Sequence, residues 1–195
     1  MTLIVVRHGR TDANASGLLL GRRLDPGLDA LGVRQASALA AVVTGAHRVV
    51  CSPLRRTRET AEAFGLSVTV DERWIEIDYG TLDGTPMVDV PAATWAEWRA
   101  DIDYVPGGGE SLAALGQRVR AACTDLVEEA KVHDIVVVTH VSPIKAAAAW
   151  ALGAPDEVTW RMYCAPASIT EIGTTGAAPS LHSFNITTHL EKISN

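Results

Sequence analysis

The feature that most constrains the fold is an alternation of short apolar runs with segments of helical periodicity. Leu3–Val6 and Ile135–Val138 are wholly apolar and too short for helices, as is typical of strands buried on both faces. Between such runs, apolar residues recur at helical spacing, for example over residues 32–43 and 111–131. This alternation favours a central, mostly parallel sheet with helices on both faces.

The alternation can be divided into individual elements. Strands are predicted at Leu3–Val6, Val49–Cys51, Val68–Val70, Ile135–Val138, Ser168–Ile172 and Leu181–Ile186. Helices are predicted at Gly32–Val43, Leu54–Phe64, Ala92–Ala100, Pro143–Leu152 and from a cap at Ser111 to about Lys131. The last two strands are too close for a helical crossover, so we expect at least one antiparallel strand. With 195 residues and no repeat or linker, residues 1–195 are predicted to form a single domain.

Composition narrows the classes of partner. The chain is 47% hydrophobic, which is enough for a packed core, and its net charge of −6 argues against a nucleic-acid or anionic-membrane binder. No apolar run approaches the roughly 18 residues of a membrane span. Cys51, Cys123 and Cys164 are widely spaced, which predicts buried thiols in a reducing compartment rather than disulfides or a zinc site. We therefore expect a cytoplasmic protein.

Chemically active side chains follow three of the predicted strands. Arg7-His8-Gly9 follows the first strand, Ser52 to Arg56 follows the second, and Thr139-His140 follows the strand at 135–138. Ligands in such sheets bind beyond the carboxyl ends of the strands, so these residues are expected at one edge. Glu76 lies in a glycine-containing loop between them.

This set of side chains suits the transfer of a phosphoryl group. The group in transfer spreads negative charge over its oxygens, which the guanidinium forks of Arg7 and Arg56 match. A neutral histidine such as His8 is a competent nucleophile, and nearby arginines lower its pKa and favour the neutral form. A protonated Glu76 would give the leaving alkoxide its proton. Because the arginines and His140 supply positive charge, we expect neither a metal nor another cofactor.

Together these residues resemble the histidine phosphatase superfamily, in its phosphoglycerate-mutase-like branch. The similarity covers nearly the whole chain. The matching motifs are Arg7-His8-Gly9-x-Thr11-x-x-Asn14, Leu28-x-x-x-Gly32-x-x-Gln35-Ala36, Ser52-x-Leu54-x-Arg56-Thr57-x-x-Thr60-Ala61, Glu76-x-x-Tyr79-Gly80-x-x-x-Gly84, Gly108-Gly109-Glu110-Ser111 and Asn185-x-Thr187-x-His189-Leu190.

The resemblance implies a fold and a set of roles. It implies a three-layer α/β sandwich with a six-stranded, mostly parallel sheet and one antiparallel strand. It implies a phosphohistidine intermediate on His8 and a phosphate pocket formed by Arg7, Arg56 and His140. It also assigns the proton donor to Glu76. In this family the position of Asn14 also lies near the phosphate, and the backbone at the position of Gly21 lines the site.

The sequence departs from the family pattern at several positions. Arg10 stands where Glu or Gln is usual, and Arg22 and Arg23 add charge near the expected pocket mouth. Arg10 and Arg22 are therefore candidate substrate-binding residues for a second negative group, unless all three are solvated. Val141-Ser142-Pro143 after the second histidine resembles acid-phosphatase-like members from actinobacteria.

A pair of tryptophans and the length of one loop bear on the substrate. Trp95 and Trp98 are spaced as one helix face, which predicts core packing or a wall of the pocket. Glycerate mutases of this family carry a longer insertion over the site, whereas only residues 85–106 fill that gap here. The resulting open site favours hydrolysis of a small phosphorylated metabolite over a cofactor-dependent phosphoglycerate mutase.

Other functions are weighed on the same residues. A metal-dependent hydrolase using His8, His140 and His189 lacks the usual paired histidine spacing. A non-catalytic phospholigand-binding domain is disfavoured because every residue needed for chemistry is present. A serine hydrolase would need a G-x-S-x-G motif, which the sequence lacks. The sequence leaves a homodimer open, because dimers are common among folds of this size.

Overall fold

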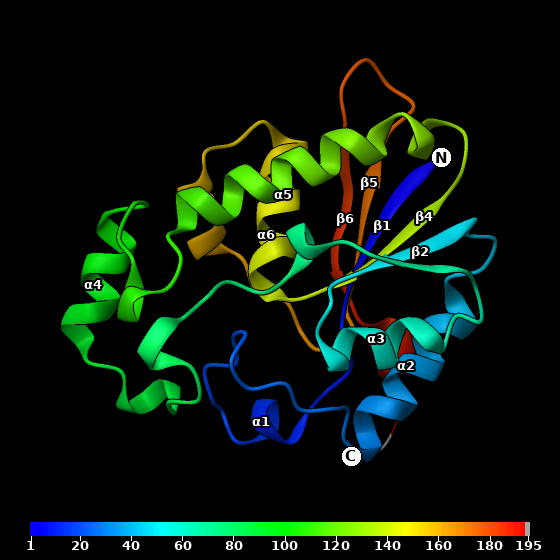
Figure 1. The fold of residues 1–195 in the computed structure, drawn as a ribbon. Coiled ribbons are helices and arrows are strands. Elements are labelled where there is room, and N and C mark those ends of the chain that lie inside the picture. The colour runs from blue at the N-terminus through cyan, green and yellow to red at the C-terminus, as the bar shows by residue number, and fades with distance from the viewer. Residues whose placement is uncertain (194–195) are drawn as a thin grey trace.

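The computed structural model describes residues 1–193, which form a six-stranded sheet with helices on both faces (Figure 1). The strands are β1 (Thr2–Arg7), β2 (Arg48–Cys51), β3 (Val68–Val70), β4 (Ile135–Thr139), β5 (Ile169–Gly173) and β6 (Ser180–Ile186). The helices are α1 (Asp12–Ala15), α2 (Ala30–Val42), α3 (Arg55–Glu62), α4 (Ala92–Ala100), α5 (Leu112–Val127) and α6 (Val141–Leu152). Within residues 1–193, no helix is both long and apolar enough to cross a membrane.

The sheet has the strand order β3-β2-β4-β1-β5-β6. The pairs β1–β4, β2–β4 and β2–β3 are parallel, whereas β5 runs antiparallel to both β1 and β6. The three-layer fold with a mostly parallel sheet and one antiparallel strand is therefore confirmed. The order places β4 and β1 at the centre, where their apolar runs are buried on both faces.

Two hydrophobic cores, one on each face, hold the layers together. On one face, Leu3, Val5 and Ile135 pack with α5 and α6. Successive side chains of β1 point to opposite faces, so Ile4 and Val6 pack on the other face with residues of α2 and α3. Each fully buried valine, leucine or isoleucine contributes about 1.5–3 kcal/mol through the hydrophobic effect. The ends of the central strands are thereby fixed in position.

Most element boundaries differ from the predictions by one to three residues. Helix α6 begins at Val141 rather than Pro143, because a proline in the first turn needs no hydrogen-bond acceptor for its nitrogen. Helix α5 ends at Val127 and is followed by the separate turn Glu129–Lys131. The short helix α1 was not predicted, although Thr11 and Asn14 form a capping box that could have indicated it.

Close contact between two backbones explains one of the glycine motifs. A Cβ on Gly9, in the turn after β1, would lie 2.4 Å from the carbonyl oxygen of Gly32 in α2. A Cβ on Gly32 would collide with the backbone of Arg10 in the same way. Glycine at both positions therefore lets the turn that carries His8 pack directly against α2.

Candidate active site

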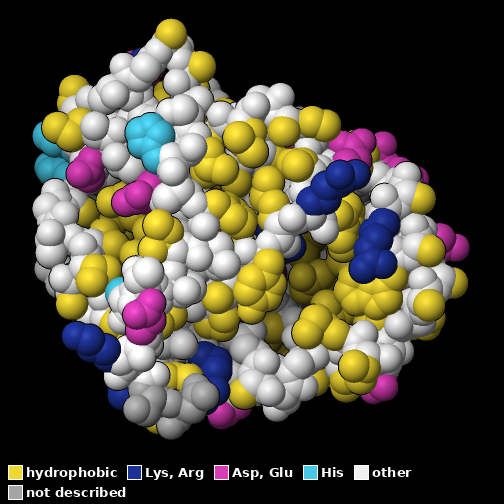
Figure 2. Space-filling model, turned by 180° about the vertical axis from the view of Figure 1, so that it is seen from behind, with side chains coloured by type: hydrophobic (Ala, Val, Ile, Leu, Met, Phe, Trp, Pro, Cys, Tyr) yellow, Lys and Arg dark blue, Asp and Glu magenta, His cyan; other side chains and the backbone are white. Residues whose placement is uncertain are grey.

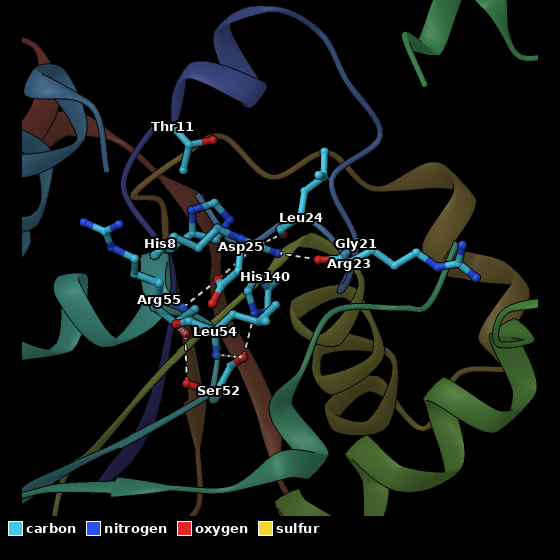
Figure 3. A network of polar contacts seen from close by, with 12 residues as sticks. His8, Thr11, Gly21, Arg23, Leu24, Asp25, Ser52, Leu54, Arg55 and His140 are labelled. Carbon is cyan, nitrogen blue, oxygen red and sulfur yellow. Dashed lines mark hydrogen bonds and ion pairs between the residues drawn. The ribbon is translucent and has the colours of Figure 1, made fainter. Parts of the chain in front are cut away.

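The carboxyl ends of β1, β2 and β4 bring the predicted residues together. Arg7 lies opposite Thr139 in the β1–β4 pairing, so the residues that follow, His8 and His140, leave the sheet at the same edge. The two imidazole rings lie edge to face with their centroids 5.1 Å apart. Figure 3 shows the His140 ring beside Ser52, which follows β2, with the His8 ring on the other side of His140.

The hydrogen bond of His8 defines its tautomer. Its Nδ1 lies 2.7 Å from the carbonyl oxygen of Gly9. Because a carbonyl oxygen can only accept, Nδ1 carries the proton and Nε2 keeps its lone pair. Burial and the charges of Arg56 and Arg7 lower the pKa of His8 well below 6.5, which outweighs the opposite effect of the Gly9 hydrogen bond. The ring is therefore neutral near neutral pH and keeps a free lone pair on Nε2.

The second histidine is held by a serine hydroxyl. His140 is fully buried, and its Nε2 lies 2.8 Å from Oγ of Ser52. Its Nδ1 is buried and has no hydrogen-bond partner within residues 1–193. Burial and the charge of Arg56 lower the pKa of His140 well below 6.5, with further contributions from His8 and Arg7. If Ser52 donates to Nε2, Nδ1 carries a proton that it can donate to an anion.

Two guanidinium groups, one fully buried and one half-buried, contribute positive charge. Arg56 is fully buried on α3, where its Nη2 donates to the carbonyl oxygen of Gly21 at 2.9 Å. Burial lowers the pKa of Arg56 to about 10, with Glu76 opposing the shift, so the group stays charged at neutral pH. Arg7 donates from Nη1 to the carbonyl oxygen of Cys164 at 2.7 Å. In the described part of the chain the Nε atoms of both arginines lack a hydrogen-bond partner.

The neighbouring arginine behaves differently. Arg55 has a side chain that is 65% exposed and pairs with Glu59 at 2.6 Å on the same helix. The choice of Arg56 rather than Arg55 as the arginine that faces the histidines therefore agrees with the geometry.

Glu76 is buried at the amino end of α6. Its Oε1 accepts hydrogen bonds from the backbone nitrogens of Ile77 at 2.8 Å and Ser142 at 3.2 Å. The second of these comes from the first turn of the helix, where backbone donors have no partner within the helix. With Oε1 occupied, Oε2 is the oxygen that remains to hold a proton.

Gly21 and Asn14 occupy different places around these groups. Gly21 donates its N–H to Asp83 and accepts from Arg56, so its backbone positions the arginine. A Cβ at this position would lie 2.9 Å from the side chains of both Asp83 and Tyr79, so the tight fit requires glycine. The amide oxygen of Asn14 accepts from Thr11, which leaves its amide nitrogen to face a ligand.

A cavity of about 330 Å³ opens onto these residues. We call it the phosphate pocket; its polar wall contains Arg7, His8, Asn14 and Glu76, with Tyr79 and Lys145 further along. The loop over residues 17–21 closes one side, because Leu19 pairs through its backbone with Gly84 and Thr85. Arg56 and His140 are fully buried beneath this surface and do not line it.

The structure does not bring all candidate residues to this pocket. Arg10 pairs with Asp29 at 2.7 Å. Arg22 binds Glu110 at 2.6 Å and the backbone oxygen of Glu76 at 2.6 Å. Neither lines the phosphate pocket, and Figure 3 shows Arg23 pointing away from the histidines. Arg22 therefore supports the loop that carries Glu76. It shares the Glu110 carboxylate with Arg118, whereas Arg10 is held by Asp29.

The three histidines that a metal-dependent hydrolase would use do not meet, because His189 lies apart from His8 and His140. His189 donates from Nε2 to the carbonyl oxygen of Ala167 and lines a separate, larger groove of about 510 Å³ with Val43 and Ile169. In residues 1–193, no group of three or more histidine, cysteine or acidic side chains is arranged to hold a metal ion.

Several residues near the pocket were not predicted to have a role. Ser52 orients His140, and Lys145 of α6 lines the pocket wall. Lys145 lies five residues after His140, on the helix that starts at the site, and this spacing could have indicated it. Tyr163, Cys164 and Pro166 come from the irregular segment before β5, where the sequence shows no pattern.

Comparison with known proteins agrees with this geometry. The family model of the histidine phosphatase superfamily, branch 1, matches residues 3–187. Phosphoserine phosphatase 1 of Hydrogenobacter thermophilus is 32% identical over 200 residues, covering 96% of this chain and 93% of the relative. A bifunctional protein of Mycobacterium tuberculosis is 32% identical over 188 residues. That match covers 90% of this chain, which spans about half (51%) of the mycobacterial relative.

Solved structures show the same relationship. Phosphoserine phosphatase of Entamoeba histolytica, in complex with phosphoserine, superimposes with a TM-score of 0.89 at 26% identity, covering 97% of this chain and 98% of the other. A mycobacterial glucosyl-3-phosphoglycerate phosphatase gives a TM-score of 0.82 at 30% identity, covering 95% and 99%. The buried histidine pair, the strand-end arginines and the match over residues 3–187 lead to one conclusion: this chain belongs to the histidine phosphatase superfamily, branch 1.

Proposed function

We propose that this chain is a metal-independent phosphatase that hydrolyses a small phosphomonoester through a phosphohistidine on His8. One observation carries the proposal. Three buried nitrogens, Nε of Arg7, Nε of Arg56 and Nδ1 of His140, lack a hydrogen-bond partner within residues 1–193. All three belong to side chains next to His8: the two arginines lower the pKa of its ring, and the His140 ring contacts it edge to face. Because an unpaired buried donor costs about 1–3 kcal/mol, such a set favours an anion rich in acceptors, which a phosphoryl group is.

The first half-reaction forms the phosphohistidine. Nε2 of His8 attacks phosphorus and a new N–P bond replaces the P–O bond of the ester. The leaving oxygen takes the proton from Oε2 of Glu76, which becomes a carboxylate. Arg7 holds the oxygens of the transferred group from the pocket wall. The buried Arg56 and His140, which lie beside the His8 ring, offer it Nε and Nδ1 while its negative charge is redistributed.

The second half-reaction releases phosphate. The Glu76 carboxylate takes a proton from water as the water oxygen attacks phosphorus, and the N–P bond breaks to restore neutral His8. Asn14, which lines the phosphate pocket, donates from its amide nitrogen to the same oxygens in this proposal. Each step returns the carboxyl group to the state that the other step needs, so no further proton donor is required.

Hydrolysis is favoured over a mutase by the short cover of the site. Only residues 85–106 lie between the Glu76 loop and the glycine-rich segment 107–111 that leads into α5, so water can reach the phosphohistidine from the phosphate pocket. The three cysteines are buried and free, which fits a reducing compartment such as the cytoplasm.

A panel of phosphomonoesters tests the proposal. Phosphate release is measured with and without a metal chelator, and with and without 2,3-bisphosphoglycerate and 3-phosphoglycerate. We expect turnover that survives the chelator and that falls by at least about 10⁴-fold in His8→Ala, because the nucleophile is lost.

The other outcomes separate the alternatives. Activity only in the presence of 2,3-bisphosphoglycerate, with interconversion of phosphoglycerates, would identify a mutase. Binding of phosphoesters without release of phosphate would identify a non-catalytic domain. Full activity in a folded His8→Ala variant, checked by circular dichroism, would overturn the mechanism.

A further inference from the structure

A second cavity, of about 170 Å³, adjoins the phosphate pocket. Trp95, Trp98 and Trp160 line it together with apolar residues such as Ile77 and Leu112, and we call it the tryptophan pocket. It shares Leu19, Tyr79, Met87, Val141 and Lys145 with the phosphate pocket. Five shared wall residues make the two cavities neighbours, so a group attached to a bound phosphate can extend from one into the other.

The tryptophan rings form a rigid, flat-sided wall. Trp95 and Trp98 are stacked at 5.6 Å with an angle of 9° between their planes. Trp160 stands nearly perpendicular to both, and Tyr79 meets Trp98 edge to face. Figure 2 shows a hollow with mainly hydrophobic walls on the side of the molecule that holds α4. A cavity of about 150 Å³ with apolar walls holds a benzene ring, so this pocket matches one ring in size.

The pocket also contains donors that have no acceptor. The indole N–H groups of Trp98 and Trp160 are buried and make no hydrogen bond within residues 1–193. The side chain of Lys145 has no hydrogen bond or ion pair in that range and stands in the wall that both cavities share. Burial lowers the pKa of Lys145 because its ammonium group is poorly hydrated. These groups favour a ligand that carries an acceptor or a negative charge.

Two other kinds of ligand fit less well. A cationic group such as choline suits aromatic walls, but Lys145 would repel it and the Arg99 guanidinium already lies 5.6 Å and 5.5 Å from the centroids of the Trp95 and Trp160 rings. A sugar needs several hydrogen-bond partners. The three wall hydroxyls are already engaged, since those of Ser142 and Tyr79 bond each other and Thr159 donates to the carbonyl oxygen of Asp156.

We propose that the substrate is a phosphomonoester whose leaving group contains a flat apolar ring, seated in the tryptophan pocket, with a carboxylate or similar acceptor facing Lys145. This inference rests on the proposed phosphatase function and names its substrate class. The residues that bind the phosphoryl group do not select the leaving group, whereas the tryptophan wall and Lys145 do.

The experiment compares 2-phenylethyl phosphate with ethyl phosphate, because both leave as primary alcohols and differ mainly in the ring. For the wild-type protein, we expect kcat/KM to be at least about tenfold higher for the phenylethyl ester, as is usual for a filled apolar pocket. Trp160→Leu should remove most of this preference. The matched control is Trp150→Leu, which changes a tryptophan of α6 that lines a different cavity. This variant should keep the preference for the phenylethyl ester.

A second comparison tests the role of Lys145. The phosphate ester of 3-phenyllactate adds a carboxylate next to the ester carbon. Lys145→Met should lower kcat/KM for this ester by about tenfold more than it lowers kcat/KM for 2-phenylethyl phosphate. Equal losses for the two esters would overturn the carboxylate assignment.

The remaining outcomes are decisive as well. Wild-type values within about twofold for the phenylethyl and ethyl esters would overturn the ring assignment and leave the phosphatase function intact. A preference for phosphocholine or glucose 6-phosphate would do the same and would identify a cationic or a sugar leaving group. Hydrolysis of none of these esters would instead refute the phosphatase function itself.

Discussion

The two sides of the site are built in different ways. The phosphate side comes from residues at the ends of adjacent central strands, so the sheet register fixes Arg7, His8 and His140 relative to one another. The tryptophan side comes from α4, the first residue of α5 and the turn that contains Trp160, segments that lie outside the sheet. We infer that the sheet fixes the residues that bind the phosphoryl group, whereas the segments outside the sheet determine which leaving group binds.

The largest loss of kcat/KM is expected for a substitution on the phosphate side of the site. Arg56→Lys keeps a positive charge but loses the planar fork that reaches Gly21, so kcat/KM should fall by about 10²–10³-fold. Arg55→Lys is the matched control on the same helix, and steady-state kinetics should show little change. Similar losses in both variants would mean that Arg56 acts through general charge alone.

The next effect concerns the proton donor. Glu76→Gln keeps the size and the hydrogen bonds at Oε1 but cannot give up a proton. For alkyl phosphates we expect kcat to fall by about 10²-fold, with a much smaller loss for a 4-nitrophenyl ester, whose leaving group needs no proton. Losses of the same size for both esters would assign the proton transfer to another residue.

The two buried histidines should also make stability depend on pH. The pKa values of His8 and His140 are lowered in the folded protein, so below pH 6.5 the unfolded chain binds more protons than the folded one. The free energy of unfolding should therefore fall as the pH drops below 6.5, by up to about 1.4 kcal/mol per pH unit for each histidine.

Urea unfolding at pH 7, 6 and 5 measures this dependence. His8→Asn should flatten it relative to the wild type, because one of the two buried imidazoles is gone. Parallel curves for the two proteins would show that His8 takes up protons equally in the folded and unfolded states.

The smallest effect is expected at a cation outside the pocket. Arg10→Ala breaks the ion pair with Asp29 but removes no group that lines the phosphate pocket. We expect kcat/KM to change by less than about twofold, with a small loss of stability typical of partly exposed pairs. A selective rise in KM for a substrate with two negative groups would return Arg10 to the binding site.

The sequence indicated where the residues of the phosphate side lie, for a physical reason. Short runs such as Leu3–Val6 are recognisable as buried strands, and the residues that follow them must meet at one edge of a parallel sheet. The same approach placed Arg10 and Arg22 near the pocket mouth, because a charge in a loop carries no signal of its partner. Their acceptors, Asp29 and Glu110, are 19 and 88 residues away in the sequence.

The tryptophan side could be predicted only in part. The spacing of Trp95 and Trp98 indicated either core packing or a pocket wall, and the structure gives both, since the rings stack and also line a cavity. Trp160 joins them from a turn 62 positions beyond Trp98, and nothing in its local sequence indicates that contact. Tertiary packing of irregular segments is the part that periodicity does not reveal.

Chemical quench of the reacting protein tests the central claim most directly. The wild-type chain is mixed with a ³²P-labelled phosphomonoester, stopped in alkali during turnover and digested, and the labelled peptide is sequenced. We predict an acid-labile, alkali-stable label on the peptide that contains His8, absent from His8→Asn. Turnover in the wild type with no protein-bound label, or a label on any other residue, would contradict the proposed phosphohistidine.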